Sequence, residues 1–488
     1  MRPADKQYIS DLAASVLLLI ILAVAAAIRF QDLARTSLWY DEAVSWSQSN
    51  GSFADLLASV AADNYPPLHN VVLWQTMPLI GDSETALRLP SALLGVLSVW
   101  LVYLIGRHLR DKTTGLLAAA LLTFSPFHIW YSTEARMYAL LAACGLAFLL
   151  AALKVLKKPS AIWVVLLALS GALFLYSHVY ALFGFACVGS ACAAFALKDV
   201  LDPEKRLRSS ALVACLAMAA SVVLFAPWLV ILAGRARSVA NEGFWIAFPD
   251  LTFLRTTAFT LSGSLVLFWV LVGLAVVGVV STLLKRPHHG DNSVEARQSV
   301  VICVAYTLGP ALLAYFYSIL VQPILFDRYL IAAWPGLLLL AALGAGFGFP
   351  RLAPLALFGV ALVLTYPQLK FTLTEKIRPE WREVAAYYLE NREPNDRLVL
   401  YKGFAEPVLS YYLRGENQFE AVESVDAVPH LSYVPETGNT WLLLAHLSGR
   451  ETDDARQASA TESVPPAIQR FGWGASGLTL LKSGPAPK

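Results

Sequence analysis

The chain has 488 residues, of which 57% are hydrophobic and 15% are charged, and its formal net charge is +2. Soluble domains carry about 25% charged residues, and a water-soluble protein of this length could not bury so much apolar surface in one core. The composition excludes disordered and collagen-like chains and argues strongly against a water-soluble enzyme. The small net charge gives no indication of nucleic-acid binding. A multi-span membrane protein is the class that remains.

Apolar runs near twenty residues long support this class, because about 20 apolar residues cross a bilayer as a helix. The first run, Leu12 to Ile28, has no convincing small-residue cleavage site before Arg29, so we interpret it as an uncleaved first helix. Ten further runs bring the expected number of spans to eleven: 86–106, 115–130, 137–153, 161–177, 179–197, 211–233, 264–284, 299–320, 329–349 and 351–368. The five cysteines lie within these runs without metal-ligand spacing, which indicates reduced packing residues.

The distribution of Lys and Arg predicts the orientation. If the N-terminus is cytoplasmic, sixteen of the Lys and Arg residues that precede Lys370 fall in cytoplasmic segments and eight, all Arg, fall in the opposite loops. Because cytoplasmic loops carry the excess of basic residues, the count favours a cytoplasmic N-terminus. Eleven crossings then place the C-terminal segment outside the cytoplasm. The Ala/Leu-rich composition suggests a bacterium, and therefore a location in its inner membrane.

The composition changes from Lys370 onward, where charges and prolines become frequent. Apolar residues between Trp381 and Leu389 recur at i, i+3, i+4, i+7 and i+8, which predicts an amphipathic helix. Residues 397–401, 440–445 and 478–481 are strand candidates, and 447–465 is expected to be a loop. We therefore expect a transmembrane domain, residues 1–369, and a small extracytoplasmic α/β domain, residues 370–488.

The first outer loop, residues 30–85, is far longer than a simple connection needs. Ser37 to Trp46 is expected to form a short interfacial helix, and Ser52 is expected to cap a second one. The two prolines of the segment Asp63 to His69 favour an extended approach to the next helix.

Asp41 and Glu42 are adjacent in this loop. Neighbouring helical residues diverge by about 100°, so only one of them would face a given site. The alternative is that both are solvated interfacial acids.

Three further segments place charged residues at helix ends on the outer side. Glu134, Arg136 and Tyr138 begin an apolar helix, where Glu134 and Arg136 could also form a structural ion pair. His178 lies between two runs, where a helix-end histidine is usually a hydrogen-bonded structural residue. Arg328 stands at a helix start, which makes an anion site more plausible. The polar residues gathered at this face are Asp41, Glu42, Asp63, His69, His128, Glu134, Arg136, His178, Asp327 and Arg328.

These residues carry a family resemblance. The acidic pair, the Asp63 to Leu68 segment, Glu134 to Tyr138, Tyr176 to His178 and Arg328 to Leu330 resemble the GT-C superfamily of polyprenyl-phosphate-sugar-dependent glycosyltransferases. More narrowly, the chain resembles glycosyltransferase family 39, which includes the protein O-mannosyltransferases, and more distantly the lipid A aminoarabinose transferases. Relatives often have His or Lys immediately before the two prolines, where this chain has Tyr65. Phosphate or metal contact from that position is therefore in doubt.

The resemblance implies a GT-C fold and an inverting transfer of a sugar from a polyprenyl phosphate to an acceptor hydroxyl at the extracytoplasmic face. It implies that Asp41 is the general base and that Glu42 assists or positions it. Arg136 and Arg328 would stabilise the departing phosphate. The remaining candidates for donor binding are Glu134, Tyr138, Asp63, His69 and His178.

The donor is expected to be an undecaprenyl-phosphate sugar, and the acceptor a lipid, glycan or protein. A monophosphate needs little charge neutralisation, and the sequence has no HExxH motif or Cys/His ligand spacing. We therefore expect no essential metal and no other cofactor, although the family pattern leaves a divalent metal open.

Two other functions fit a polytopic chain. A lipid or sugar transporter or flippase would perform no covalent chemistry, but it would place its key charges at mid-membrane rather than at one face. A non-catalytic scaffold would use the C-terminal domain to bind a partner.

Overall fold

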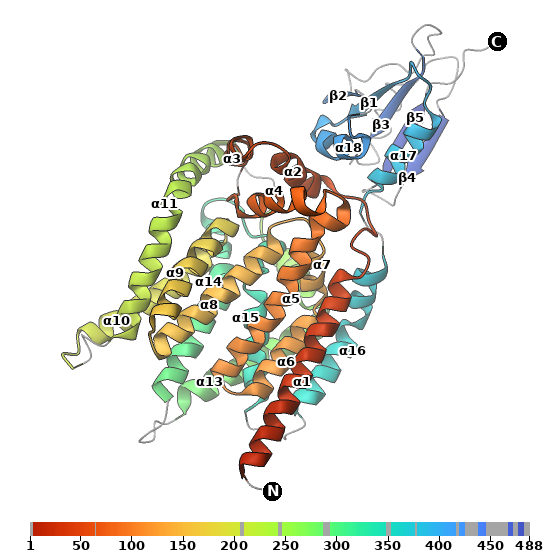
Figure 1. Cartoon of the computed structure of the whole chain (residues 1–488). Coiled ribbons are helices and arrows are strands. Elements are labelled where there is room, and N and C mark those ends of the chain that lie inside the picture. The colour runs from red at the N-terminus through yellow and green to blue at the C-terminus, as the bar shows by residue number, and fades with distance from the viewer. Residues whose placement is uncertain are drawn as a thin grey trace. The chain divides into compact units, whose positions relative to one another are not determined.

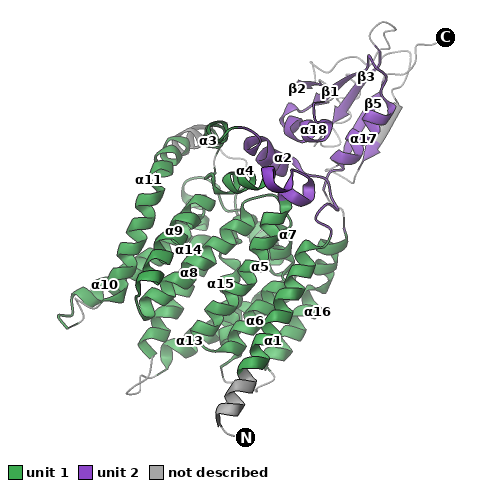
Figure 2. Cartoon of the chain, in the orientation of Figure 1, with its two compact units in different colours: residues 1–31, 52–76, 88–374 green, residues 32–51, 77–87, 375–488 purple. Residues whose placement is uncertain are grey.

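The structure, a computed structural model, describes residues 3–63, 65–204, 209–242, 246–285, 293–347, 353–375, 378–415, 419–424, 438–445, 467–471 and 477–482 (Figure 1). The chain forms two compact units (Figure 2). Unit 1 comprises residues 1–31, 52–76 and 88–374, and unit 2 comprises residues 32–51, 77–87 and 375–488. The division after Thr374 lies close to the expected boundary at 369/370. Two segments of the first loop, however, cluster with the C-terminal segment rather than with the membrane helices.

The membrane helices of unit 1 run beside one another (Figure 1). The long apolar helices are α1 (Pro3–Phe30), α5 (Glu84–Leu109), α8 (Tyr138–Lys157), α10 (Ala181–Val200), α11 (Ser210–Glu242), α13 (Leu265–Leu284), α14 (Ser293–Leu320) and α16 (Ala353–Thr374). Within the described residues, these eight are long and apolar enough to cross a membrane. The pair α6 (Lys112–Thr123) and α7 (Pro126–Ser132), bent by 66° at its break, adds a ninth span if it counts as one. The chain is a multi-pass membrane protein, as its composition predicted.

Each of the eleven expected spans coincides with a helix or with this bent pair. Two of the helices, α9 (Ala161–Ser177) and α15 (Trp334–Ala345), are apolar but shorter than a bilayer requires. The run at 329–349 is shorter as a helix because its first residues belong to the 3-10 turn η2 (Asp327–Leu330). The count of eleven crossings stays a prediction.

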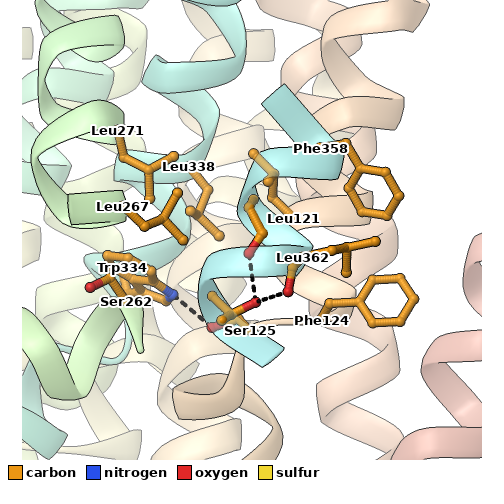
Figure 3. A pocket seen from close by; sticks show the side chains of 12 residues that line it. Leu121, Phe124, Ser125, Ser262, Leu267, Leu271, Trp334, Leu338, Phe358 and Leu362 are labelled. Atoms are coloured by element: carbon orange, nitrogen blue, oxygen red, sulfur yellow. Dashed lines mark hydrogen bonds between the residues drawn. The ribbon is translucent and has the colours of Figure 1, made fainter. Parts of the chain in front are cut away.

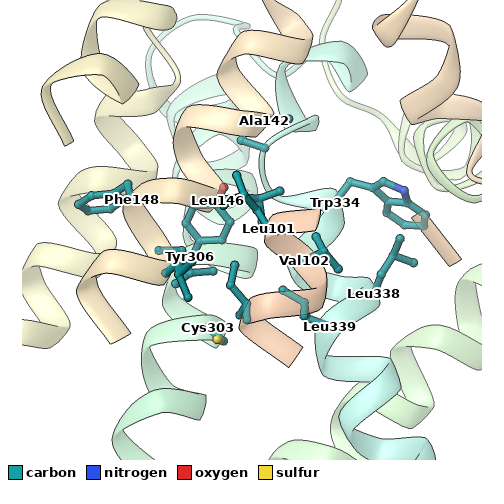
Figure 4. Close-up of a cluster of buried hydrophobic side chains, with 14 of the residues drawn as sticks. Leu101, Val102, Ala142, Leu146, Phe148, Cys303, Tyr306, Trp334, Leu338 and Leu339 are labelled. Carbon is teal, nitrogen blue, oxygen red and sulfur yellow. The ribbon is translucent and has the colours of Figure 1, made fainter. Parts of the chain in front are cut away.

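The interior of unit 1 is packed by side chains from several helices (Figure 4). Leu146 and Phe148 of α8 and Tyr306 of α14 belong to one buried cluster, together with Leu339 of α15. The helices α13 and α15 approach each other closely at Gly344, where a Cβ would lie 1.8 Å from the carbonyl oxygen of Leu274. Only glycine allows this approach.

Arg29, at the end of α1, holds the bend between α6 and α7. Its fully buried guanidinium donates to the carbonyl oxygens of Leu122 (3.1 Å) and Thr123 (3.3 Å) and to Nδ1 of His128 (2.9 Å). Carbonyls at a helix C-terminus lack intrahelical donors, so this arginine satisfies the end of α6. His128 thus has a structural explanation.

A small cavity lies at the same bend (Figure 3). The cavity has a volume of about 20 Å³, and Leu121, Leu267 and Phe358 are among the residues that line it. At its edge, Trp334 Nε1 donates a hydrogen bond of 2.9 Å to Ser125 Oγ. Such a volume holds about one water molecule, so this cavity cannot take a substrate.

The long first loop, residues 30–85, is largely helical. It contains α2 (Tyr40–Ser49), α3 (Phe53–Ala61) and α4 (Leu68–Ile80). Ser52 caps α3 through a capping box with Asp55, as predicted. The helix α4 was not predicted, because its 13 residues are too few for a span and Pro78 lies inside it.

Unit 2 contains a five-stranded sheet of order β2-β1-β3-β5-β4. The strands are β1 (Arg397–Tyr401), β2 (Phe419–Val422), β3 (Thr440–Leu444), β4 (Ala467–Phe471) and β5 (Leu478–Lys482). β1 pairs in parallel with β2 and β3, and β5 pairs antiparallel with β3 and β4. The helices are α17 (Trp381–Asn391) and α18 (Glu406–Leu413).

Both faces of this sheet are buried, as the burial of β1, β3 and β5 shows. One face packs against α17 and α18, and Ala43 of α2 belongs to the same core. The predicted C-terminal α/β region is confirmed, with α17, β1, β3 and β5 where the sequence placed them, and the domain bounds 370–488 stay a prediction. The expected loop 447–465 lies outside the described residues.

Candidate active site

Asp41 and Glu42 occupy the first turn of α2, in unit 2, and differ in their surroundings. Glu42 is fully buried, and its Oε2 accepts hydrogen bonds from the Trp39 backbone N–H (3.3 Å) and from Nη1 of Arg378 (3.2 Å). Asp41 is half-buried. Since consecutive helical residues diverge by about 100°, the two carboxylates point in different directions. Both acids lie where the helix dipole favours negative charge.

Unit 1 holds a group of cationic and aromatic side chains that we call the arginine–tyrosine cluster. Its members are Tyr65, Arg136, Tyr138, His178, Tyr180, Arg328 and Tyr329. They come from the α3–α4 connection, the start of α8, the α9–α10 junction and η2. Topology therefore brings four distant stretches of sequence together.

Arg136 is buried with its Cζ 5.6 Å from the centroid of the Tyr65 ring. The Tyr65 hydroxyl forms a hydrogen bond of 2.8 Å with that of Tyr329. Burial raises the pKa of the Tyr65 phenol, and Tyr329 and Tyr138 raise it further. The phenol therefore stays protonated near neutral pH and can act as a hydrogen-bond donor.

Arg328 lies among three aromatic rings. Its Cζ is 5.7 Å from the ring centroids of Tyr138 and Tyr329 and 4.8 Å from that of Phe326. Cation–π contacts of this kind attract a guanidinium to the faces of aromatic rings. The preceding residue, Asp327, accepts a hydrogen bond of 2.6 Å from the Arg328 backbone N–H.

His178 lies at the centre of the rings, 4.8 Å from Tyr329 and 5.2 Å from Tyr65 between centroids. Its Nδ1 accepts a hydrogen bond from the Tyr180 backbone N–H (3.0 Å), so the neutral ring carries its proton on Nε2. The side chain is fully buried, and Nε2 has no partner among the described residues. A buried donor of this kind is expected to meet a ligand or water.

An apolar cavity of about 430 Å³ adjoins the cluster. Tyr65, Tyr180 and Tyr329 line it and belong to the cluster as well. The rest of its wall comes from α10, α11, α14 and the segment after α14, with Leu182, Leu229, Leu232 and Ile324 as apolar examples. Arg235 and Gln322 add polar groups to the lining. Three of the long apolar helices thus contribute to the wall of this cavity.

The other predicted site residues of unit 1 surround the segment before α8. His69 is buried, and its Nε2 donates to the carbonyl oxygen of Ala135 over 3.0 Å, which ties α4 to this segment. Glu134 is also buried there, whereas Asp63 is partly exposed in the turn after α3. His69 is therefore explained as a positioning contact.

The arginine–tyrosine cluster of unit 1 thus brings together four of the predicted site residues, Arg136, Tyr138, His178 and Arg328. The two predicted catalytic residues, Asp41 and Glu42, belong to unit 2. Sequence reasoning missed Tyr180 and Tyr329, although each is next to or near a motif that it quoted. It also missed Arg378, which has no local signal. Among the described residues, no group of three or more His, Cys, Asp or Glu side chains could hold a metal ion. The absence of an essential metal stays a prediction.

Residues 64–231, about a third of the chain, match the family model described as dolichyl-phosphate-mannose-protein mannosyltransferase. This stretch contains Arg136 and His178. No curated protein matches the chain.

Solved structures show the fold. ArnT from Cupriavidus metallidurans in the apo state matches with a TM-score of 0.63 and 13% identity, over 97% of this chain and 100% of ArnT. The same protein bound to undecaprenyl phosphate matches equally, over 96% and 99%. The oligosaccharyltransferase of Archaeoglobus fulgidus, in complex with zinc and sulfate, matches with a TM-score of 0.55 and 14% identity, over 90% of this chain and 69% of that protein.

The chain has the GT-C fold. The family match and the fold together indicate a glycosyltransferase, as the sequence predicted. Fold similarity at this level of identity assigns no role to an individual residue.

Proposed function

We propose that this GT-C protein transfers a sugar from a polyprenyl-phosphate donor to an acceptor hydroxyl at the extracytoplasmic face of a bacterial inner membrane, with inversion. The observation that carries the proposal is the arginine–tyrosine cluster beside an apolar cavity. A lipid phosphate has one anionic group and one long apolar chain, and it needs both environments side by side. The undecaprenyl phosphate bound by ArnT is consistent with this class of ligand.

The cluster has the groups that a phosphate monoester requires. Guanidinium groups bind phosphate through parallel charge-assisted hydrogen bonds, and Arg136 and Arg328 supply them. The ring contacts at 5.6 and 5.7 Å restrict both arginines, so little rotamer entropy is lost on binding. His178 Nε2 adds a buried neutral donor. Together these groups stabilise the negative charge that grows on the phosphate as the sugar departs.

Asp41 is proposed as the general base, on the family pattern and on its half-buried position in the first turn of α2. The acceptor oxygen attacks the anomeric carbon, its proton passes to the Asp41 carboxylate, and the bond to the phosphate oxygen breaks. The bonding electrons leave with the polyprenyl phosphate. A single displacement of this kind inverts the anomeric configuration. Glu42, which faces Arg378, is not proposed to take the proton.

The test is sugar transfer by Asp41→Asn. Membranes of a deletion strain expressing the variant would be given radiolabelled undecaprenyl-phosphate mannose, chosen from the description of the matching family model, and other undecaprenyl-phosphate sugars in parallel. We expect transfer to fall by about two to four orders of magnitude, the usual contribution of a general base. Asp55→Asn, an exposed carboxylate at the start of α3, is the matched control and should retain activity. Undiminished transfer by Asp41→Asn at equal expression would exclude Asp41 as the base.

A further inference from the structure

The helix α2 is built into unit 2 through one of its faces. Glu42, Ala43, Ser45 and Ser49 are buried, and Ala43 belongs to the same apolar core as Trp381 of α17. The carboxylate neighbouring this face, Asp41, is only half-buried. The Asp41 carboxylate is attached to the first turn of α2, so its position depends on how firmly that turn is held.

The first turn is held by an ion pair and by a ring contact, in which Tyr40 packs edge-on against Phe404 with the centroids 5.5 Å apart. Glu42 is 0% exposed and Arg378 is 9% exposed, and the ion pair between them measures 3.2 Å. The same carboxylate oxygen accepts the Trp39 backbone N–H, which closes the helix N-terminus. A buried ion pair is weak evidence for stability, because apolar residues of similar volume often replace one at no loss. Its use is to impose one arrangement on the groups that it joins.

A second set of contacts holds the residues just before α2. Ser37 Oγ donates to Glu383 over 2.8 Å, and Arg382 donates to the carbonyl oxygen of Ala34 over 3.0 Å. The hydroxyl of Tyr412 accepts the backbone N–H of Leu38 over 2.6 Å. These contacts fix the segment entering α2, and the Glu42–Arg378 pair fixes the first turn that follows it.

We propose that Arg378 is a positioning residue for Asp41. It fixes the Glu42 carboxylate and with it the first turn of α2, so that the Asp41 carboxylate is held in one orientation. Glu42 acts through this contact and not on the substrate. The inference rests on the proposed role of Asp41 as general base.

The test compares Arg378→Met with Arg378→Lys, and both with Arg397→Met. Arg397 lies in the same unit and donates to Thr440 Oγ1 of β3, away from α2, so it is the matched control. The probe is undecaprenyl-phosphate mannose, or whichever undecaprenyl-phosphate sugar the unmodified protein uses. We expect Arg378→Met to lower kcat by roughly 100-fold, as a misplacement of about 1 Å can do, with the donor KM within about twofold. Arg378→Lys should recover part of the loss, and Arg397→Met should show none.

A double-mutant cycle separates positioning from other roles. In the Asp41→Asn background, Arg378→Met should cost at most about threefold, because the group that it positions is gone. An undiminished 100-fold loss in that background would overturn the proposal, since Arg378 would then act independently of Asp41. A full activity of Asp41→Asn itself would instead show that the proposed base is wrong.

Amide hydrogen exchange provides a readout that needs no activity. Arg378→Met should speed exchange in residues 40–49 at least tenfold and leave residues 397–401 protected. The control Arg397→Met should not affect residues 40–49. Unchanged exchange in α2 of Arg378→Met, or a general loss of protection across unit 2, would overturn the proposal.

Discussion

Replacing Arg328 with Met would remove one guanidinium from the arginine–tyrosine cluster and keep most of the apolar stem. The guanidinium lies among three aromatic rings, with its Cζ 4.8–5.7 Å from their centroids, and the unbranched apolar side chain of Met can fill the space beside these rings. What is lost is a charge-assisted hydrogen bond to phosphate, worth about 1.5–3 kcal/mol. That range corresponds to a loss of about 10- to 150-fold in kcat/KM.

The loss should appear mainly in kcat. The phosphate gains negative charge as the sugar departs, so the arginine binds the transition state more tightly than the donor. The assay is steady-state transfer from undecaprenyl-phosphate mannose by purified protein, with a thermal unfolding curve to verify folding. Arg328→Lys should be intermediate, because an ammonium keeps the charge but not the bidentate geometry.

The matched control is Arg255→Met, an exposed arginine of α12 (Leu251–Ser262) in the same unit. It should retain kcat/KM within about twofold. A loss below about threefold in folded Arg328→Met would refute the reasoning that Arg328 binds the departing phosphate. An equal loss in Arg255→Met would show that the effect is not specific to the cluster.

Three further predictions concern packing, pH and metals. Gly344→Ala should destabilise the protein by about 1–3 kcal/mol in denaturation assays, because its Cβ would overlap the Leu274 carbonyl oxygen; unchanged stability would contradict the close α13–α15 crossing. Burial raises the pKa of Asp396, but hydrogen bonds from Trp441, Glu393 and Asn439 outweigh it and lower the pKa below its usual value. The Asp396 carboxylate therefore stabilises unit 2 above the unfolded pKa of about 4, and this contribution is lost as pH falls through the lower folded pKa. Asp396→Asn should flatten the acid dependence of stability and lower the free energy of unfolding by about 1–2 kcal/mol at neutral pH. EDTA should leave sugar transfer unchanged, because two arginines suffice for a monophosphate, and a loss restored by a divalent cation would contradict this.

Local patterns in the sequence predicted those elements whose residues carry a strong period. The apolar runs correspond to helices, and Trp381 to Leu389 form most of α17 because their apolar residues share one face. β1 was predicted because the last four of its five residues are apolar and a turn precedes them. By contrast, β2 (Phe419–Val422) has a weak pattern with two exposed residues, and it depends on pairing with β1 for its conformation.

The candidate site was predictable only in part, for a similar reason. The sequence indicated Arg136, His178 and Arg328 because ionisable residues are rare near apolar helices. Placing such a group in a membrane costs free energy, so its presence usually has a functional reason. Tyr65 looked like a departure from the family pattern, yet it pairs with Tyr329, which lies 264 residues away. The partner of Glu42, Arg378, is 336 residues away. No local period signals contacts of that range, because they arise from tertiary packing.

We propose above all that this protein transfers a sugar from a lipid phosphate to an acceptor, and so forms a glycosidic bond between the sugar and the acceptor. The most direct measurement reconstitutes the purified protein in liposomes with labelled undecaprenyl-phosphate mannose and acceptor membranes, and follows both the label and the lipid. We expect a covalently labelled acceptor, an inverted anomeric configuration and one undecaprenyl phosphate released per sugar transferred. Intact donor crossing the bilayer with no covalent product would contradict it and favour a flippase.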